Sequence, residues 1–504
     1  MELLNRRDGR FIWLQGPPGT GKTAIAKSTA HSLAQDKRLA ASFFWDKTSS
    51  RASADSIELF PSTLASQLAT FSRDYEIFLV NRLLDRSFRN ILRLPLEHRM
   101  ESLIIEPMRL ISKAFSSREG YPVVVLDGLD ECGDRDDLAK LMELVLLFNH
   151  LPPNFMVLVS GRPEPEICAV LGPSQDIPRL YTDKISQDDT DRTVTLMVEN
   201  GLAEIRQPAH LCWMPSDDEL HEFIETCRQL PVLAQIRVRE VRILTSSGHT
   251  LQDAFCIVKD DGAVSRDLND DYLRILRRAY RRANISHAAR YSSRTARLTT
   301  SGVALTVSPN VLRTYRKVVG TVIAARRPLS VQTMSKILAI SEENIRAALD
   351  PIGSIINTPV SNDDPVHFYH ATAEEFLTGP PQGDEVDRSF FFSDVKGIFL
   401  ALPLLKVLNN NLKRNIANTA SSIELGDGGC LGLDKTPKHV SYAAEHWPMH
   451  LDLLSASEEL WKELRLFLTM NLLFWVELSM DHESALLTAL EQKKVSGDSI
   501  ERIL

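Results

Sequence analysis

Residues 16–23 have the types and spacing of a loop that binds phosphate. The eight residues are Gly16, Pro17, Pro18, Gly19, Thr20, Gly21, Lys22 and Thr23, in the pattern G-x-x-x-x-G-K-T. Glycines let backbone N–H groups converge on the β-phosphate, and a following helix N-terminus adds partial positive charge. Lys22 is a predicted cation for the β- and γ-phosphate oxygens, and the Thr23 hydroxyl is a predicted Mg²⁺ ligand. The alternative is a glycine-rich turn without a ligand.

An acidic turn predicts a second part of the same site. The apolar run at residues 121–126 is typical of a central parallel strand, and Asp127 follows it directly. An acid at the carboxyl end of such a strand can hold the Mg²⁺ shell, so Asp127 is the predicted residue. Asp130 or Glu131 is expected to orient or activate the attacking water. The alternative is a solvated acidic turn.

A third apolar run, residues 155–159, precedes a turn that contains Arg162. Ligands bind at the carboxyl edge of open α/β sheets, where all three turns should meet. A guanidinium at this edge can bind the γ-phosphate through two donors. The alternative is a surface arginine in a proline-rich turn.

The elements that must position these residues predict an α/β fold. Residues 11–14 favour a buried strand ahead of the loop, and residues 24–34 favour a helix behind it. The predicted architecture is a P-loop NTPase core with a parallel sheet, followed by a helical domain, a winged helix and an all-α C-terminal segment.

These motifs resemble a known family. The acid cluster at residues 127–132 and the turn at residues 160–165 are similar to those of the NACHT group of STAND-class NTPases, which transduce signals. Residues 41–45 and 60–69 match the fungal members with a nephrocystin-like N-terminal domain. The resemblance extends over most of the chain and implies a switch driven by exchange of ADP for ATP.

The resemblance implies two further site residues. Residues 227–234 are similar to the G-L-P-L-A element of the helical domain, whose proline packs near the bound adenine; this role transfers to Pro231. Residues 368–377 resemble the winged-helix motif F-x-H-x-S-x-x-E/D-F-L, whose histidine donates to the β-phosphate of ADP; this role transfers to His370. The alternatives are a proline that begins a helix and a core histidine.

Three departures from the family pattern are visible. Gly161 stands where a serine or threonine is usual, which we expect to loosen the turn, and Thr372 and Ala373 replace the usual serine and phenylalanine. Relatives also carry an effector domain and a base-seating segment ahead of the loop. We expect both to be absent from this chain, together with the C-terminal repeats.

Composition shifts predict four parts along the chain: a P-loop core at residues 1–182, a helical domain with a basic linker at 183–300, a winged helix at 311–377 and a helical segment at 384–504. Helices are expected at residues 217–229 and 231–244, and from an N-cap at Asn269 to residue 282. Residues 288–310 predict a loop. Ser330 and Ser341 are predicted helix caps, and residues 355–356 and 366–368 are predicted wing strands.

Bulk properties limit the partners of this chain. Its 504 residues carry a net charge of −8, which argues against broad binding of nucleic acid or anionic membranes. Arginines of the helix at residues 269–282 could contact nucleic acid, but a solvated or domain-facing basic side is the preferred interpretation. The six cysteines have no metal or disulfide spacing, and no signal peptide is visible, so we expect a cytoplasmic protein. No apolar run is long enough to cross a membrane. His446 and His450 are spaced like a metal pair, but no second ligand pair is evident, and helix packing around Trp447 is the preferred interpretation.

Together these observations predict a slow NTPase that acts as a conformational switch with ATP/ADP and Mg²⁺ as cofactors, ATP being preferred over GTP. The expected partners are a purine nucleotide and, on activation, further copies of the chain, with an effector that the sequence does not identify. Two alternatives remain: a motor of the AAA+ class, which turns over fast, and a scaffold that no longer hydrolyses nucleotide.

Overall fold

The structure of the chain is a computed structural model. It describes residues 10–45, 57–85, 91, 94–115, 120–133, 135–172, 180–185, 187–205, 213–283, 305–392, 398–412, 436–451 and 457–479. These residues fall into two compact units, residues 1–264 and residues 265–504. Most of the loop predicted at 288–310 and the end of the predicted C-terminal segment lie outside the described residues. The finer division into four parts remains a prediction.

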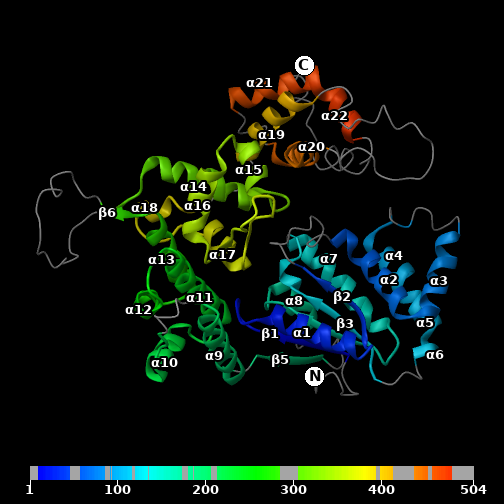
Figure 1. Cartoon of the computed structure of the whole chain (residues 1–504). Helices are drawn as coiled ribbons and strands as arrows, with labels where there is room; N and C mark the ends of the chain where they lie inside the picture. Colours follow the sequence, from blue (N-terminus) through cyan, green and yellow to red (C-terminus); the bar gives the residue numbers. More distant parts are fainter. Residues whose placement is uncertain are drawn as a thin grey trace, which may run out of the picture. The chain divides into compact units, whose positions relative to one another are not determined.

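The first unit is coloured blue to green in Figure 1. It contains a parallel sheet of five strands in the order β2-β3-β4-β1-β5. The strands are β1 (Phe11–Gln15), β2 (Leu39–Phe44), β3 (Val123–Asp127), β4 (Met156–Ser160) and β5 (Leu180–Lys184). Every neighbouring pair is parallel. The predicted α/β core is therefore confirmed, and the carboxyl ends of β1, β3 and β4 meet at one edge of the sheet.

Alternate side chains of the strands supply two separate hydrophobic cores. Ile12, Val125 and Leu158 pack on one face with Leu33 of α1 (Lys22–Gln35). Residues on the other face, such as Trp13, pack against the remaining helices of this domain. Because both faces are buried, the central strands β3 and β4 are apolar up to their last residues instead of alternating with polar residues.

Several short helices cover the second face of the sheet. They are η2 (Ile57–Leu59), α2 (Phe60–Phe71), α3 (Arg73–Leu84), α4 (Leu96–Met100), η5 (Glu101–Ile105), α5 (Glu106–Leu110), α6 (Ser112–Phe115), η6 (Leu129–Glu131), α7 (Arg135–Leu146), η7 (Leu147–His150) and α8 (Pro165–Leu171). Their buried side chains belong to one cluster with that face, so the sheet and these helices form a single core.

Four helices complete the first unit. They are α9 (Gln187–Ala203), α10 (Asp217–Thr226), α11 (Pro231–Ser246) and α12 (Leu251–Val264). The predicted helix at residues 217–229 is three residues too long: α10 ends at Thr226, because Arg228 and Gln229 adopt left-handed backbone with φ of 50° and 57°. The predicted start of the next helix at Pro231 is confirmed.

The second unit begins with helices around a two-stranded wing. They are α13 (Leu268–Tyr280), α14 (Pro309–Ala324), α15 (Val331–Leu338), α16 (Glu342–Leu349), η9 (Asp350–Ile352), α17 (Ala371–Thr378) and α18 (Glu385–Arg388), with strands β6 (Arg282–Ala283) and β7 (Leu305–Thr306), and β8 (Ile356–Asn357) and β9 (His367–Phe368). The caps at Ser330 and Ser341 are confirmed, since their hydroxyls accept hydrogen bonds from backbone N–H groups three residues on. The wing is confirmed as the antiparallel pair β8–β9.

Two expectations for this unit are wrong in detail. Helix α13 is capped by Asp267, whose carboxylate accepts from the Asp270 N–H at 2.9 Å, and not by Asn269. The loop or insertion predicted at residues 288–310 extends too far, because residues 305–306 form β7 and residues 309–310 begin α14. Pro309 takes the first helical position of α14, where a missing N–H costs nothing.

The arginines of α13 are engaged within the second unit. Arg277 donates to both carboxylate oxygens of Asp387, with its closest contact at 2.7 Å, and Arg281 reaches the same carboxylate at 2.5 Å. Arg274 pairs with Asp271 at 3.2 Å. The Asp387 side chain is fully buried. The basic face that the sequence leaves open to nucleic acid is thus largely a set of internal ion pairs.

A helical group ends the described chain. It comprises α19 (Ile398–Asn411), α20 (Lys438–His450), α21 (Glu458–Leu466), η12 (Phe467–Asn471) and α22 (Leu472–Ser479). In α20, His450 is buried and His446 is partly buried, and burial lowers their pKa values to about 4 and about 3. Both imidazoles pack against the ring of Tyr442, which fits the packing interpretation. No group of three potential metal ligands occurs within the described ranges. Within the same ranges, no helix is long and apolar enough to cross a bilayer.

Candidate functional site

The phosphate loop connects β1 to α1 at the carboxyl edge of the sheet. Gly19 and Gly21 have φ of 79° and 90°, a backbone region that other residues rarely adopt. Gly21 is the N-cap of α1, and no described side chain caps this helix start. The backbone N–H groups of the first turn are therefore directed to the loop and are suited to an anion.

Lys22 lies over the loop that precedes it. Its ammonium donates to the carbonyl oxygens of Gly16 at 2.7 Å and Pro17 at 3.0 Å. Burial is the main influence on the pKa of Lys22 and lowers it, while nearby Asp130 is the main influence that raises it. Asp127, Glu131 and Arg162 also affect this pKa, so the residues predicted from three separate motifs share one electrostatic environment.

Asp127 is a buried carboxylate at the end of β3. Its side chain accepts the hydroxyl hydrogen of Ser160, which ends the neighbouring strand β4, at Oδ1. Its Oδ2 is buried and has no hydrogen-bond partner among the described residues. Burial raises the pKa of Asp127, and the nearby Ser160 and Thr23 hydroxyls and the Lys27 ammonium oppose this rise. An unpaired carboxylate oxygen beside a threonine hydroxyl fits the oxygen ligand set of Mg²⁺.

Asp130 and Arg162 hold each other at the same edge. The Asp130 carboxylate accepts from the Arg162 backbone N–H and from its Nε, both at 3.0 Å. Gly161 allows this approach, since a Cβ there would lie 3.2 Å from Asp130 Oδ1. The glycine therefore does not loosen the turn, because the two contacts between Arg162 and Asp130 hold it in place. Asp130 is thus placed to position Arg162.

The acidic turn itself depends on a glycine. Gly128 has φ of 72°, and a Cβ at this position would lie 2.7 Å from the Trp45 carbonyl oxygen. The Trp45 N–H also donates to the Asp127 carbonyl at 2.9 Å. This close approach of two backbone segments fixes where η6, and with it Glu131, begins. Glu131 is partly exposed.

The start of α11 lies on the phosphate loop. The Val232 N–H donates to the Gly19 carbonyl at 3.3 Å, and a Cβ at Gly19 would lie only 2.4 Å from Val232 Cγ1. Pro231 is the first residue of this helix and is itself buried. The structure thus brings Pro231 next to the loop, more than two hundred residues away in sequence, as a base-proximal role requires.

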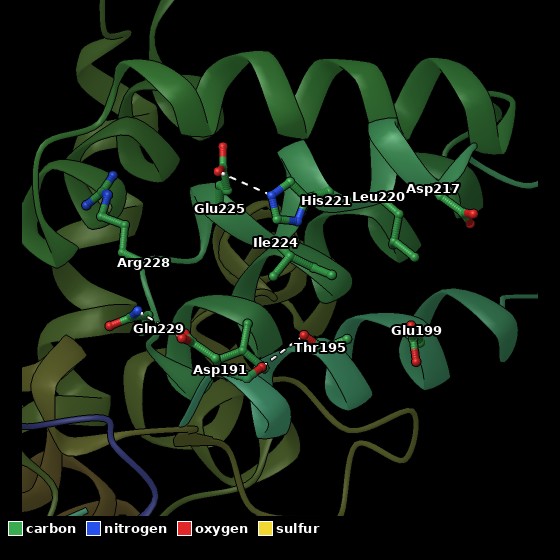
Figure 2. Close-up of a pocket in the computed structure, with 11 residues that line it drawn as sticks. Asp191, Thr195, Glu199, Asp217, Leu220, His221, Ile224, Glu225, Arg228 and Gln229 are labelled. Atoms are coloured by element: carbon green, nitrogen blue, oxygen red, sulfur yellow. Dashed lines mark hydrogen bonds and ion pairs between the residues drawn. The ribbon is translucent and has the colours of Figure 1, made fainter. Parts of the chain in front are cut away.

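The turn before Pro231 also borders a groove of about 840 Å³ between α9 and α10. Figure 2 shows Gln229 directed at Asp191, whose carboxylate accepts from Gln229 Nε2 at 3.0 Å. His221 and Glu225 approach to 3.4 Å on the α10 side. This groove was not predicted, because residues of two helices and the left-handed turn line it together.

His370 belongs to the second unit and is the N-cap of α17. Its Nδ1 accepts from the Thr372 backbone N–H at 3.2 Å and contacts the Thr372 hydroxyl at 2.7 Å. The imidazole is partly buried. Thr372 occupies the position that the family motif assigns to serine, and its hydroxyl contacts the histidine directly.

Three residues of these sites were not predicted: Ser160, Val232 and Thr372. Ser160 has a signal in the sequence, since it ends the strand before Arg162 and could be paired with Asp127 once β3 and β4 are taken as neighbours. Val232 has none, because its role depends on the tertiary contact with Gly19. Thr372 was noted only as a departure from the family pattern.

The first third of the chain is similar to a described protein family. Residues 2–162 match the family model described as Nephrocystin 3, N-terminal. No curated protein matches the chain. Among solved structures, the Walker-type ATPase PABY2304 of Pyrococcus abyssi covers 73% of this chain and 90% of its own, with 13% identity and a TM-score of 0.32. Cdc6p from Pyrobaculum aerophilum covers 75% and 81%, with 13% identity and a TM-score of 0.32. Similarity at this level adds no argument about function. The chain has a P-loop NTPase fold, and its first third is similar to the N-terminal region of nephrocystin 3.

Proposed function

We propose that this chain is a purine-nucleotide switch that binds ATP or ADP with Mg²⁺ at the phosphate loop and hydrolyses ATP slowly. The observation that carries the proposal is the convergence of Lys22, Asp127 and Arg162 at one sheet edge, beside an uncapped helix start. This set supplies a cation, a metal ligand and a donor for the γ-phosphate, which phosphoryl transfer requires together.

Asp127 and Thr23 are the residues that would hold Mg²⁺, because one carboxylate oxygen of Asp127 is buried without a partner among the described residues. The bound ion would supply positive charge that offsets the negative charge of the phosphates. Ser160 keeps the carboxylate in place through Oδ1, which leaves Oδ2 as the candidate metal ligand.

Hydrolysis needs a base for water and a cation for the developing charge. Glu131 takes a proton from the attacking water while the oxygen of that water bonds to the γ-phosphorus. The bond between the γ-phosphorus and the β,γ-bridging oxygen breaks, which releases ADP and inorganic phosphate. Arg162 stabilises the charge on the γ-phosphate oxygens. The ion pair with Asp130 partly neutralises the positive charge of Arg162. Arg162 therefore stabilises the developing charge on the γ-phosphate less strongly, which favours slow turnover.

The switch itself rests on the family resemblance of residues 368–377. His370 donates to the β-phosphate of ADP in the resting state, and exchange for ATP releases it. A ligand shifts such an equilibrium only through different contacts in the two states, which this donor provides. The released form associates with further copies in the cytoplasm and acts on an effector protein.

The test combines a binding variant and a turnover variant. Lys22→Ala removes one charged hydrogen-bond donor to phosphate and should weaken ATP binding about 10- to 100-fold by calorimetry. Glu131→Gln should keep ATP binding and lower turnover about 10²-fold or more. Lys140→Ala and Glu143→Gln, both on exposed positions of α7, are the matched controls and should change neither quantity.

Three results would contradict the proposal. Equal ATP affinity in the wild type and Lys22→Ala would remove the phosphate loop as the binding site. Unchanged turnover in Glu131→Gln would remove the assigned base. Wild-type turnover of about ten per second or more, typical of efficient enzymes, would favour the motor over the switch.

A further inference from the structure

A buried chain of hydrogen bonds connects α13 to His370 at the start of α17. The Tyr272 hydroxyl lies 2.7 Å from the Thr372 hydroxyl, and the Thr372 hydroxyl lies 2.7 Å from His370 Nδ1. The Thr372 backbone N–H also donates to Nδ1 at 3.2 Å. All three residues belong to the second unit.

The positions of the protons in this chain follow from one donor that cannot reverse. A backbone N–H only donates, so Nδ1 of His370 must accept and carries no hydrogen. The Thr372 hydroxyl must then supply the hydrogen of its own bond to Nδ1. Because the hydroxyl hydrogen of Thr372 is directed to His370 Nδ1, the hydroxyl oxygen of Thr372 accepts the hydrogen bond from the Tyr272 hydroxyl. The bonds therefore run from Tyr272 through Thr372 to His370, and a neutral imidazole carries its hydrogen on Nε2.

Burial keeps the first donor of this chain protonated. Tyr272 and Thr372 are 1% and 7% exposed. Burial raises the pKa of Tyr272 well above its ordinary value, so its hydroxyl remains a donor at every physiological pH. The ring of Tyr272 also packs against Phe376 of α17, at 5.5 Å between ring centroids, which holds the hydroxyl in place.

We infer that Thr372, anchored by Tyr272, is a positioning residue that holds His370 as the Nε2–H tautomer. A phosphate oxygen only accepts hydrogen bonds, so it pairs with the Nε2–H group of this tautomer. In the Nδ1–H tautomer, Nε2 carries a lone pair that repels the phosphate oxygen. The inference rests on the proposed function for the identity of the acceptor, although the tautomer itself follows from contacts within the second unit. Thr372 thereby links the α13–α17 packing to nucleotide retention.

The tautomer can be measured directly by nuclear magnetic resonance on the full chain labelled with ¹⁵N-histidine. The chain has 13 histidines, and the signals that disappear in His370→Asn identify the one of interest. The wild type should show His370 with hydrogen on Nε2 alone. Hydrogen on Nδ1, or a mixture of tautomers, in the wild type would overturn the inference.

The decisive variant removes both hydroxyls at once. Thr372→Val alone leaves the buried Tyr272 hydroxyl unpaired and can destabilise the fold, whereas Tyr272→Phe with Thr372→Val leaves no orphan. In the double variant the backbone N–H at 3.2 Å is the remaining donor to Nδ1 among these contacts, because the shorter bond from the Thr372 hydroxyl at 2.7 Å is lost. The share of the Nδ1–H tautomer should therefore rise above that of the wild type, and fluorescent ADP should be released about three- to tenfold faster, the scale of one hydrogen bond. Thr372→Ser retains the hydroxyl and should match the wild type in both readouts. A double variant with the wild-type ratio of tautomers would overturn the inference.

Replacements of His370 separate this inference from the proposed switch. His370→Gln keeps a hydrogen-bond donor near the Nε2 position, whereas His370→Asn keeps an acceptor for the helix cap. The His370→Gln variant should therefore retain ADP better than the His370→Asn variant. If His370→Ala leaves ADP release unchanged while the double variant mixes tautomers, the proposed latch fails and the positioning role stands. If His370→Ala speeds ADP release and the mixed-tautomer double variant does not, Thr372 is structural and the inference is overturned.

Discussion

Replacement of Gly19 by alanine tests whether α11 packs on the phosphate loop. Gly19 has φ of 79°, and Gly21 has φ of 90°, so alanine is strained at both positions. Only Gly19 also faces a neighbour: its added Cβ would lie 2.4 Å from Val232 Cγ1, whereas a Cβ at Gly21 has no atom within 4 Å. Gly21→Ala is therefore a matched control with the same backbone strain and no collision.

The two variants should differ by the energy of the collision. Left-handed backbone costs a non-glycine residue about 1–2 kcal/mol, which both variants share. Carbon atoms in contact lie about 3.5–4.0 Å apart, so Val232 must move by about 1 Å in Gly19→Ala. Overpacking of this kind adds about 1–3 kcal/mol, because Val232 is buried and β-branched. We expect a loss of about 2–5 kcal/mol for Gly19→Ala and about 1–2 kcal/mol for Gly21→Ala.

The assay is urea unfolding of the nucleotide-free chain followed by tryptophan fluorescence, since Trp13 and Trp45 are buried in the sheet domain. Val232→Ala should cost less stability in the Gly19→Ala background than in the wild type, with a coupling of about 1–3 kcal/mol. Equal losses for the two glycine variants, or effects of Gly19→Ala and Val232→Ala that simply add, would refute the contact between α11 and the loop.

Three further predictions follow from particular contacts. Burial raises the pKa of Asp127, so the ionised carboxylate destabilises the nucleotide-free fold at pH values above that pKa. Asp127→Asn should therefore stabilise the nucleotide-free protein at pH 8, and this gain in stability should shrink as the pH falls. Mg-ATP should raise the melting temperature of the variant less than that of the wild type. Stability curves of both proteins at several pH values measure this, and a gain that is constant with pH counts against it. Gln229→Gly should raise stability by about 0.5–1 kcal/mol, because Gln229 has φ of 57°; a loss in urea unfolding would show that its bond to Asp191 outweighs the strain. Asp387→Ala should cost about 2–4 kcal/mol, since it leaves the guanidinium of the nine-tenths buried Arg281 without this partner, and an unchanged melting temperature would mean that these ion pairs contribute nothing.

Local features of this protein could be read from the sequence. The strand at residues 11–15, the phosphate loop and the helix that starts at Lys22 adjoin each other in the chain. The caps at Ser330 and Ser341 bond to N–H groups three residues away, so residue type alone predicts them. The cap of α13 was misplaced by two residues, because Asp267 and Asn269 are both good capping residues and only the packing of α13 decides which one is used.

Only the tertiary structure decided what surrounds the phosphate loop and which charges pair. Val232 meets Gly19, Asp130 holds Arg162, and Arg277 meets Asp387 across 110 residues. The sequence left open whether these arginines form a solvated or a domain-facing side, since nothing near them in the chain identifies a partner. Helix caps and phosphate loops are specified by interactions over a few residues, so composition and spacing reveal them. Ion pairs and packing contacts form between residues that are brought together only when the whole unit is compact, and their partners depend on the order of the strands and the path of every helix between them.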